Sequence, residues 1–325
     1  MSTRFRHLSR FENILIVIVI SGTFGCAFTG KQQDIVKGKS EYRRLLELQK
    51  QKASVVTEGE ILKKIPKMTA EEYERLGDNY IRQGNIGMAF IQYDKGLLLD
   101  PNLASTRHKM GGLLLSRGMD KEAMKEFEEI LKKDPDSALA YEGKGMVFLT
   151  TDKLDKSKEA FRQAINLNTE LWQAHTFLGI IYDRQGQFEA AINEYQEAIA
   201  IKPNASTLFH VLGISYYLRG KYEKSIEALR KALRIEPANR KYYNHLGLAF
   251  SKLQRYEEAF EAFKMGGDEA SAYNNIGYIY MTEQKYKEAI YAFEKAIKIK
   301  PKFYIKAYEN LEKAKGILRI EKTKL

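Results

Sequence analysis

The chain has 325 residues, 44% of them apolar and 29% charged, and a formal net charge of +11. This composition excludes a largely disordered chain, and the single cysteine excludes an intramolecular disulfide and a cysteine-based zinc site. The excess charge lies mostly in residues 295–325, which hold ten Lys and Arg against three Glu, a run more typical of a solvated helix face than of a nucleic-acid interface.

The first thirty residues have the pattern of a secretory signal. Three arginines among the first ten residues precede the apolar run 14–20, and small residues lead to Cys26. The uncharged stretch 13–30 is short for a membrane span. We therefore expect residues 1–25 to be a signal peptide, with an uncleaved anchor or an ordinary signal as the alternatives.

The end of this segment, Thr23-Phe24-Gly25-Cys26, resembles a bacterial lipobox. The resemblance implies cleavage before Cys26 and acylation of that cysteine, and an acyl anchor holds a protein to a membrane. Gly25 fits the small residue that the family requires, whereas Thr23 and Phe24 depart from its usual residues; a buried structural cysteine is the alternative. Ala27 in place of Asp favours the outer membrane, facing the periplasm, over the inner membrane.

Residues 26–69 are expected to form a tether and a lead-in helix. The segment 31–39 is polar and unpatterned, and 41–52 is helix-prone. Thr69 and Glu72 have the spacing of a capping box, which predicts that a helix begins at residue 70.

A repeat of seven copies occupies residues 70–303. Each copy has a glycine, an aromatic or leucine three residues later, Ala or Ser after twelve and an aromatic or leucine after sixteen. The glycines are 34 residues apart, except for a last interval of 30: Gly77, Gly111, Gly145, Gly179, Gly213, Gly247 and Gly277. Five of the six prolines follow a repeat glycine by twenty-four residues.

This pattern resembles the tetratricopeptide repeat family, with its L-G-x-x-Y, Ala, Phe and Pro positions. The resemblance implies an all-α superhelical solenoid of about seven helix-turn-helix repeats, each made of a helix A and a helix B. Small residues would lie where the two helices meet, and proline would end helix B. The third copy has Thr169 in place of proline, and the sixth is four residues short, which predicts a truncated helix B and a hinge there. Residues 304–325 are expected to form a capping helix and a basic tail.

No enzymatic site is evident in the sequence. The histidines lack metal-ligand spacing, and His175 is better explained as a packed residue than as a catalytic one. There is no G-x-S-x-G, phosphate-binding or dinucleotide-binding motif. We therefore expect neither catalysis nor a cofactor or metal; an enzyme with an unrecognised site is the alternative from another class.

The family resemblance implies that helix A side chains line a concave groove for a partner peptide or helix. Carried over to this sequence, the groove is acidic at its start, apolar in the middle and rich in amides at its end. The residues are Glu71, Glu74, Asp78, Arg82, Met146, Leu149, Thr176, Ile180, Asp183, Arg184, His210, Ile214, Tyr217, Leu218, Lys241, Asn244, Leu248, Asn274 and Tyr278.

The short junction 267–278, with its A-x-N-N-I-G-Y pattern, resembles the tetratricopeptide lipoproteins of tight-adherence pilus systems. That resemblance implies a protein-binding scaffold that assists assembly of a pilus or secretion machine, with a secretin or another assembly component as partner. A cofactor of polysaccharide export or of cell-wall enzymes is the alternative. Nucleic acid is not expected as a partner, and the oligomeric state stays open.

Overall fold

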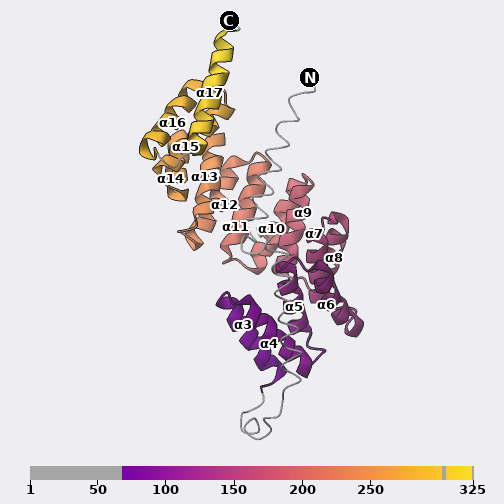
Figure 1. Cartoon of the computed structure of the whole chain (residues 1–325). Coiled ribbons are helices and arrows are strands. Elements are labelled where there is room, and N and C mark those ends of the chain that lie inside the picture. The colour runs from indigo at the N-terminus through magenta and orange to yellow at the C-terminus, as the bar shows by residue number, and fades with distance from the viewer. Residues whose placement is uncertain (1–67, 302–304, 324–325) are drawn as a thin grey trace. The chain divides into compact units, whose positions relative to one another are not determined.

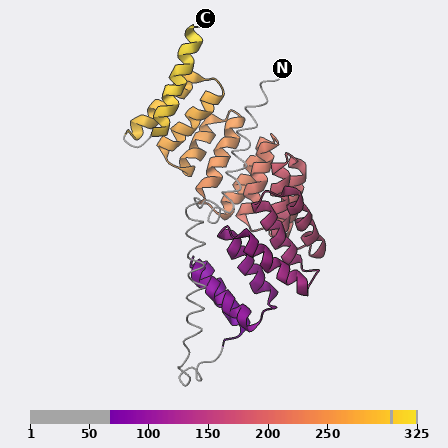
Figure 2. The same cartoon turned by 45° about the vertical axis from the view of Figure 1, so that its right-hand side comes forward.

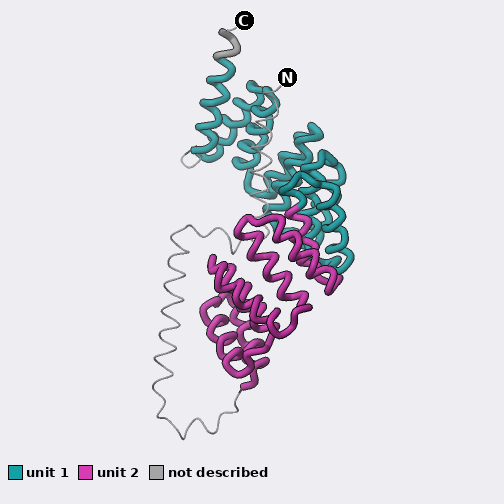
Figure 3. Tube along the Cα trace, turned by 90° about the vertical axis from the view of Figure 1, so that its right-hand side faces the viewer, with its two compact units in different colours: residues 1–23, 182–325 teal, residues 24–181 magenta. Residues whose placement is uncertain are grey.

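The computed structural model describes residues 68–301 and 305–323, with fifteen helices and no strand in that part of the chain (Figure 1). The predicted signal, Cys26, the tether and the lead-in helix lie outside the described residues. The all-α solenoid predicted from the repeats is confirmed. By contacts the described chain divides into two compact units, with the boundary after Ile181 (Figure 3).

The first unit contains α3 to α8 and most of α9. Their bounds are α3 Ala70–Arg82, α4 Ile86–Leu99, α5 Ala104–Ser116, α6 Asp120–Lys133, α7 Ala138–Thr150, α8 Leu154–Leu167 and α9 Trp172–Arg184. The capping box at the start of α3 is present: Thr69 and Glu72 each accept a hydrogen bond from the other's backbone N–H. Helix A and helix B of one repeat, such as α3 and α4, pack together as a pair.

The second unit contains α10 to α17, seen in orange and yellow in Figure 2. Their bounds are α10 Phe188–Ile201, α11 Ser206–Leu218, α12 Tyr222–Ile235, α13 Arg240–Lys252, α14 Tyr256–Gly266, α15 Glu269–Thr282, α16 Tyr286–Ile299 and α17 Ile305–Thr323. The truncated helix B is confirmed, because α14 has 11 residues where α12 and α16 have 14. The final helix α17 packs on α16 and buries Ala307, Leu311 and Ala314, whereas Tyr308 stays 45% exposed.

The repeat glycines make room for an aromatic ring on the neighbouring helix B. A Cβ on Gly111 would stand 2.5 Å from the Phe127 ring, and one on Gly143 of the next repeat would also overlap that ring. Phe127 and the small Ala123 beside it are fully buried. The glycine therefore lets a side chain, rather than a second backbone, approach helix A.

Helix B ends two residues before each of the five prolines, as predicted. In the third repeat, where Thr169 replaces proline, α8 still ends at Leu167. There the side chain of Asn168 accepts a hydrogen bond from the Glu170 N–H at 2.9 Å. Asp100 and Asp134 make the same turn beside Pro101 and Pro135 in the first two repeats, so this turn at the end of helix B forms both with and without proline.

Candidate partner-binding surface

Side chains of successive A helices meet in each unit. The helix pairs α5 and α7, α11 and α13, and α15 and α17 are in contact. Hydrogen bonds link residues about one repeat apart, such as Asn310 of α17, which donates to Asn274 of α15 at 3.2 Å. We call the surface formed by the side chains that successive A helices present along this line of contacts the A-helix surface. It includes the seven positions three residues before a repeat glycine: Glu74, His108, Glu142, Thr176, His210, Asn244 and Asn274.

The start of the A-helix surface is a charged cluster built around Glu74. Its carboxylate accepts hydrogen bonds from Ser105, Thr106 and Lys109 at 2.5 to 2.6 Å. Burial acts to raise the pKa of Glu74, but these bonds outweigh it and hold the pKa below its usual value. Lys109 also donates to Asp78 at 2.7 Å, so one lysine offsets part of the predicted acidic patch.

The hydroxyl of Tyr93 donates to the other oxygen of Asp78, which fixes that side chain on α3. Glu71 and Arg82 are exposed. A partner that approaches this end thus meets a negative surface whose geometry is set by internal bonds.

A close contact between His108 and Glu142 lies between α5 and α7. His108 Nε2 is 3.4 Å from Glu142 Oε2, and Glu142 is 3% exposed. Neither His108 Nε2 nor the other oxygen of Glu142 has a hydrogen-bond partner, although buried polar atoms are normally satisfied. Met146 and Leu149, on the same helix as Glu142, are half-buried and form the apolar part of this unit's surface.

Thr176 and Ile180 of α9 contribute little to an open surface. The Thr176 hydroxyl donates to the Trp172 carbonyl one turn earlier on its own helix, at 2.7 Å. Ile180 is buried. Both side chains therefore belong more to the packing of the first unit than to its exterior.

In the second unit Asp183 is buried between two hydroxyls. Tyr195 and Ser215 donate to its two oxygens at 2.9 and 2.8 Å. Burial raises the pKa of Asp183 to about 7, although the bonds from Ser215 and Tyr195 act in the opposite direction. The other copies have isoleucine, leucine, tyrosine, serine or methionine at this position, and Asp183 is an acidic group buried inside the core.

His210 and His245 form a pair between α11 and α13. His210 Nε2 lies 3.0 Å from His245 Nδ1, which is also 2.9 Å from the Lys241 carbonyl. A carbonyl can only accept, so Nδ1 of His245 carries the proton and His210 accepts. Burial lowers the pKa of both histidines, and the pair is neutral near pH 7.

The remaining predicted residues divide by exposure. Ile214 is buried, as are Ile180, Asp183 and His210. Lys241 is exposed, and seven others are half-buried: Arg184, Tyr217, Leu218, Asn244, Leu248, Asn274 and Tyr278. The accessible part of the A-helix surface in the second unit is thus aromatic, apolar and amide-bearing, with the cationic side chains of Arg184 and Lys241 beside these groups.

Five residues of this surface were missed from the sequence: His108, Lys109, Glu142, His245 and Asn310. A signal existed for Glu142 and for its partner His108, because both stand three residues before a repeat glycine, as Glu74 and His210 do. Asn310 lies in the final helix, which has no repeat glycine to set its register, and no sequence signal marks it.

The described residues contain no group of three or more His, Cys, Asp and Glu placed to hold a metal ion. None of their helices is long and apolar enough to cross a membrane. The surface consists instead of a helical framework that presents varied side chains in a row, the arrangement of a helical repeat protein that binds protein segments.

Family comparisons agree with this class. Models described as tetratricopeptide repeat or TPR repeat match residues 106–137, 138–170, 181–218, 213–254 and 270–303. Together these segments cover more than half of the chain. The chain belongs to the tetratricopeptide repeat family, whose members generally mediate protein–protein interactions.

No curated protein matches the chain. Among solved structures, MamA is 30% identical and covers 50% of this chain and 94% of its own, with a TM-score of 0.40. The Cut9–Hcn1 complex is 21% identical over 75% of this chain and 48% of its own, with a TM-score of 0.56. PilF of Pseudomonas aeruginosa is 19% identical over 66% and 96%, with a TM-score of 0.51. The last two show a shared helical fold.

Proposed function

We propose that this protein is a non-catalytic scaffold that binds segments of partner proteins along its A-helix surface. One observation carries the proposal. The packing positions repeat almost unchanged, and the Ala or Ser twelve residues after the glycine is fully buried in all seven copies. By contrast, the position three residues before the glycine is glutamate, histidine, threonine or asparagine, depending on the copy. Packing explains the constant positions, and recognition of a specific partner explains the varied positions that stay accessible, such as Asn244 and Asn274.

The chemistry of the surface describes the partner segment. Around Glu71 and Asp78 the first unit favours a cationic group, and Met146 and Leu149 favour an apolar side chain. In the second unit Asn244 and Asn274 favour the polar backbone of a bound peptide or helix.

We propose further that the scaffold is held to a bacterial envelope membrane through acylated Cys26, on the periplasmic side of the outer membrane or, as the alternative, of the inner membrane. The lipobox resemblance at 23–26 supports this anchor, and the junction 267–278 supports a role in pilus or secretion assembly. A secretin or another assembly component is the proposed partner. Polysaccharide-export or cell-wall enzymes are the second candidate.

Site-specific photo-crosslinking in cells tests the surface. A photoreactive residue at Met146 or Tyr217, both half-buried on A helices, should capture a defined envelope protein. The same residue at the exposed Leu98 or Ile235 on B helices is the matched control and should not capture that protein. Equal capture from both sets would overturn the proposed surface, and the captured protein distinguishes the pilus pathway from the export and cell-wall pathways.

The anchor and the absence of catalysis have separate tests. Metabolic labelling with a fatty acid should label the wild type and not Cys26→Ala, and labelling of the variant would refute acylation at that residue. Hydrolase or transferase activity of the purified protein, lost on a single substitution in the A-helix surface, would refute the non-catalytic proposal.

A further inference from the structure

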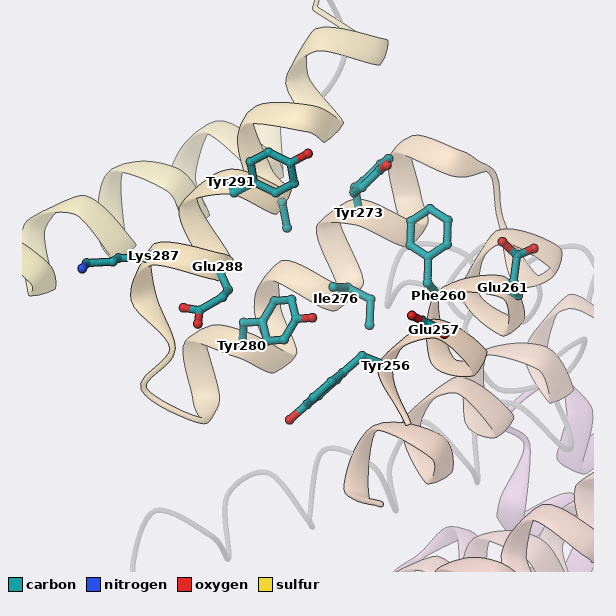
Figure 4. Close-up of a pocket in the computed structure, with 11 residues that line it drawn as sticks. Tyr256, Glu257, Phe260, Glu261, Tyr273, Ile276, Tyr280, Lys287, Glu288 and Tyr291 are labelled. Carbon is teal, nitrogen blue, oxygen red and sulfur yellow. The ribbon is translucent and has the colours of Figure 1, made fainter. Parts of the chain in front are cut away.

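A second surface lies on a different side of the last two repeats. A hollow of about 610 Å³ opens between α14 and α16, with α15 as its floor (Figure 4). Its walls are mainly aromatic, from Tyr256, Phe260, Tyr273, Ile276, Tyr280 and Tyr291. All of these residues belong to the second unit.

This hollow is distinct from the A-helix surface. On α15, Tyr273, Ile276 and Tyr280 line the hollow at spacings of three and four residues, which places them on one face of the helix. Asn274 and Tyr278 stand on another face of the same helix, and Asn274 accepts its hydrogen bond from α17. A ligand in the hollow would thus leave the A-helix surface free.

The equivalent place between α12 and α14 is covered by cations. There Phe250, three residues after its repeat glycine, has the guanidinium groups of Arg255 and Arg230 at 4.7 and 5.7 Å from its ring centre. One repeat later Tyr280 takes the place of Phe250 and Lys264 that of Arg230. Lys264 lies 4.0 Å from Glu261.

The residue that matches Arg255 is Lys285. Its ammonium group is 5.9 Å from the Tyr280 ring and closer to Tyr256, at 4.5 Å. The floor of the hollow is therefore less covered than the corresponding ring one repeat earlier.

The shortened helix α14 also contributes less to this region than its neighbours do. Twenty residues after the repeat glycine every other copy has Leu or Ile, and this copy has Gly267. The truncation that marks this repeat in the sequence thus removes an aliphatic side chain from the last turn of helix B.

Tyr291 is an exposed aromatic residue on α16, with the Lys295 ammonium group 5.3 Å from its ring centre. It is 60% exposed beside the apolar hollow. The corresponding residues of α12 and α14 are Glu227 and Glu261, which suit an exposed helix position. Tyrosine combines a large apolar ring with a polar end and is enriched where proteins bind one another, so its presence here indicates contact with a partner.

The rim carries negative charge in a chain that is otherwise basic. Glu257, Glu261 and Glu288 line the hollow with one lysine, Lys287, whereas the whole chain has a net charge of +11. Two further lysines lie nearby: Lys285 is paired with Glu283 at 2.8 Å, and Lys264 lies 4.0 Å from Glu261. A cationic ligand is therefore repelled by the protein as a whole and attracted to this place, which favours specific over non-specific binding.

We propose that the hollow between α14 and α16 is a docking site for a short, positively charged segment of a partner protein, which inserts aromatic or aliphatic side chains between Tyr291 and Phe260 and places Lys or Arg beside the rim glutamates. The volume lies within the usual range for binding pockets, about 300–1,000 Å³. The site extends the proposed scaffold by a second binding surface and does not depend on the A-helix surface.

A phage library of random dodecapeptides tests the site. Peptides are selected on the purified protein and counter-selected on Tyr291→Glu, which restores the residue type of the two preceding repeats and so preserves the helix. The surviving peptides should combine Lys or Arg with aromatic or aliphatic residues. Acidic surviving peptides would overturn the proposal, and so would a selection in which no peptide depends on Tyr291 for binding.

Fluorescence anisotropy of a selected peptide then measures how much individual residues of the hollow contribute to binding. Tyr291→Glu and Glu288→Lys should each weaken binding by about tenfold or more. The control Tyr308→Glu changes a tyrosine that is 45% exposed on α17, outside the hollow, and should change binding less than about twofold. An equal effect of Tyr291→Glu and Tyr308→Glu would refute the site.

Phe260→Ile, which restores the residue of α10 and α12, keeps the core apolar and should also weaken binding, and circular dichroism establishes that each variant is folded. Sedimentation equilibrium tests whether a second copy of this chain occupies the hollow. Self-association that is abolished by Tyr291→Glu would show that another molecule of this chain fills the hollow, and would overturn the partner proposed here.

Discussion

The contrast between two adjacent glycines on α5 gives a direct test of how the repeats pack. Replacing Gly112 by Ala meets nothing within 4 Å, so only the higher helix propensity of alanine counts, and we expect a gain of about 1 kcal/mol. Replacing Gly111 by Ala brings the same gain but places a methyl group 2.5 Å from the Phe127 ring. Overpacking of a core costs about 1–3 kcal/mol, and this ring cannot withdraw because it also lies against Gly143. The Gly111→Ala variant should therefore lose about 0–2 kcal/mol relative to the wild type, whereas Gly112→Ala gains about 1 kcal/mol.

Urea unfolding followed by far-ultraviolet circular dichroism measures both variants. A Phe127→Ala background supplies the second half of the test, because it removes the ring and leaves space for the new methyl group. In that background Gly111→Ala should stabilise the protein by about 1 kcal/mol, as Gly112→Ala does in the wild type. Changes of equal size and sign for the two glycines in the wild type would refute the reasoning that glycine is present to admit the ring.

Three further predictions concern buried polar groups and a helix end. The folded-state pKa of Asp183 is raised to about 7, so its protonation stabilises the fold below that pH, and stability should fall as pH rises from about 4 through 7. Asp183→Asn should remove this dependence and stabilise the protein at pH 8 by up to about 4 kcal/mol in urea unfolding, whereas Asn at the 90% exposed Asp155 should not. The Ser225 hydroxyl is buried without a hydrogen bond, and that of Ser157 donates to the Gly145 carbonyl at 2.7 Å. Ser225→Ala should therefore raise the free energy of unfolding by about 1 kcal/mol, seen as a higher thermal midpoint, and Ser157→Ala should lower the midpoint or hardly change it. The reverse order would contradict the conclusion that Ser225 lacks a hydrogen bond and Ser157 has one. Asn168→Ala removes the side-chain turn at the end of α8, where this repeat has no proline, and should cost about 1 kcal/mol, seen as faster hydrogen exchange at the end of α8; unchanged exchange there would contradict it.

Much of the fold could be predicted because the repeat fixes packing locally. Glycine, a small residue and an aromatic at fixed intervals define one helix pair, and each new copy repeats the same contacts. The shortened α14 was visible as a missing stretch before Gly277. Less visible were the turns between helices A and B: Asp152, Gln254 and Gln284 adopt positive φ where other copies have glycine. The residue types Asp and Gln do not by themselves predict a positive φ at these positions. The surrounding helices impose that backbone conformation.

The candidate surface could be predicted by position but not by exposure. Helix A periodicity identifies which residues share a face, and Glu74, Asp78, Asn274 and Tyr278 lie at least partly accessible there. The same periodicity also selected Asp183 and His210, which hydroxyl and imidazole groups of the next repeat enclose. Their burial depends on side chains more than thirty residues away, which no local pattern reports.

The sequence by itself determined the solenoid, its number of repeats and the constant packing positions, because each repeat buries its apolar face against a neighbour built in the same way. It also singled out the shortened junction as the place where this chain departs from its own pattern. Only the tertiary structure decided that Lys109 offsets the acidic start, that Asp183 is a core residue, and that five aromatic side chains meet in a hollow between α14 and α16. Those properties depend on which side chains of different helices come within a few ångströms of each other, and that distance is set by packing in three dimensions.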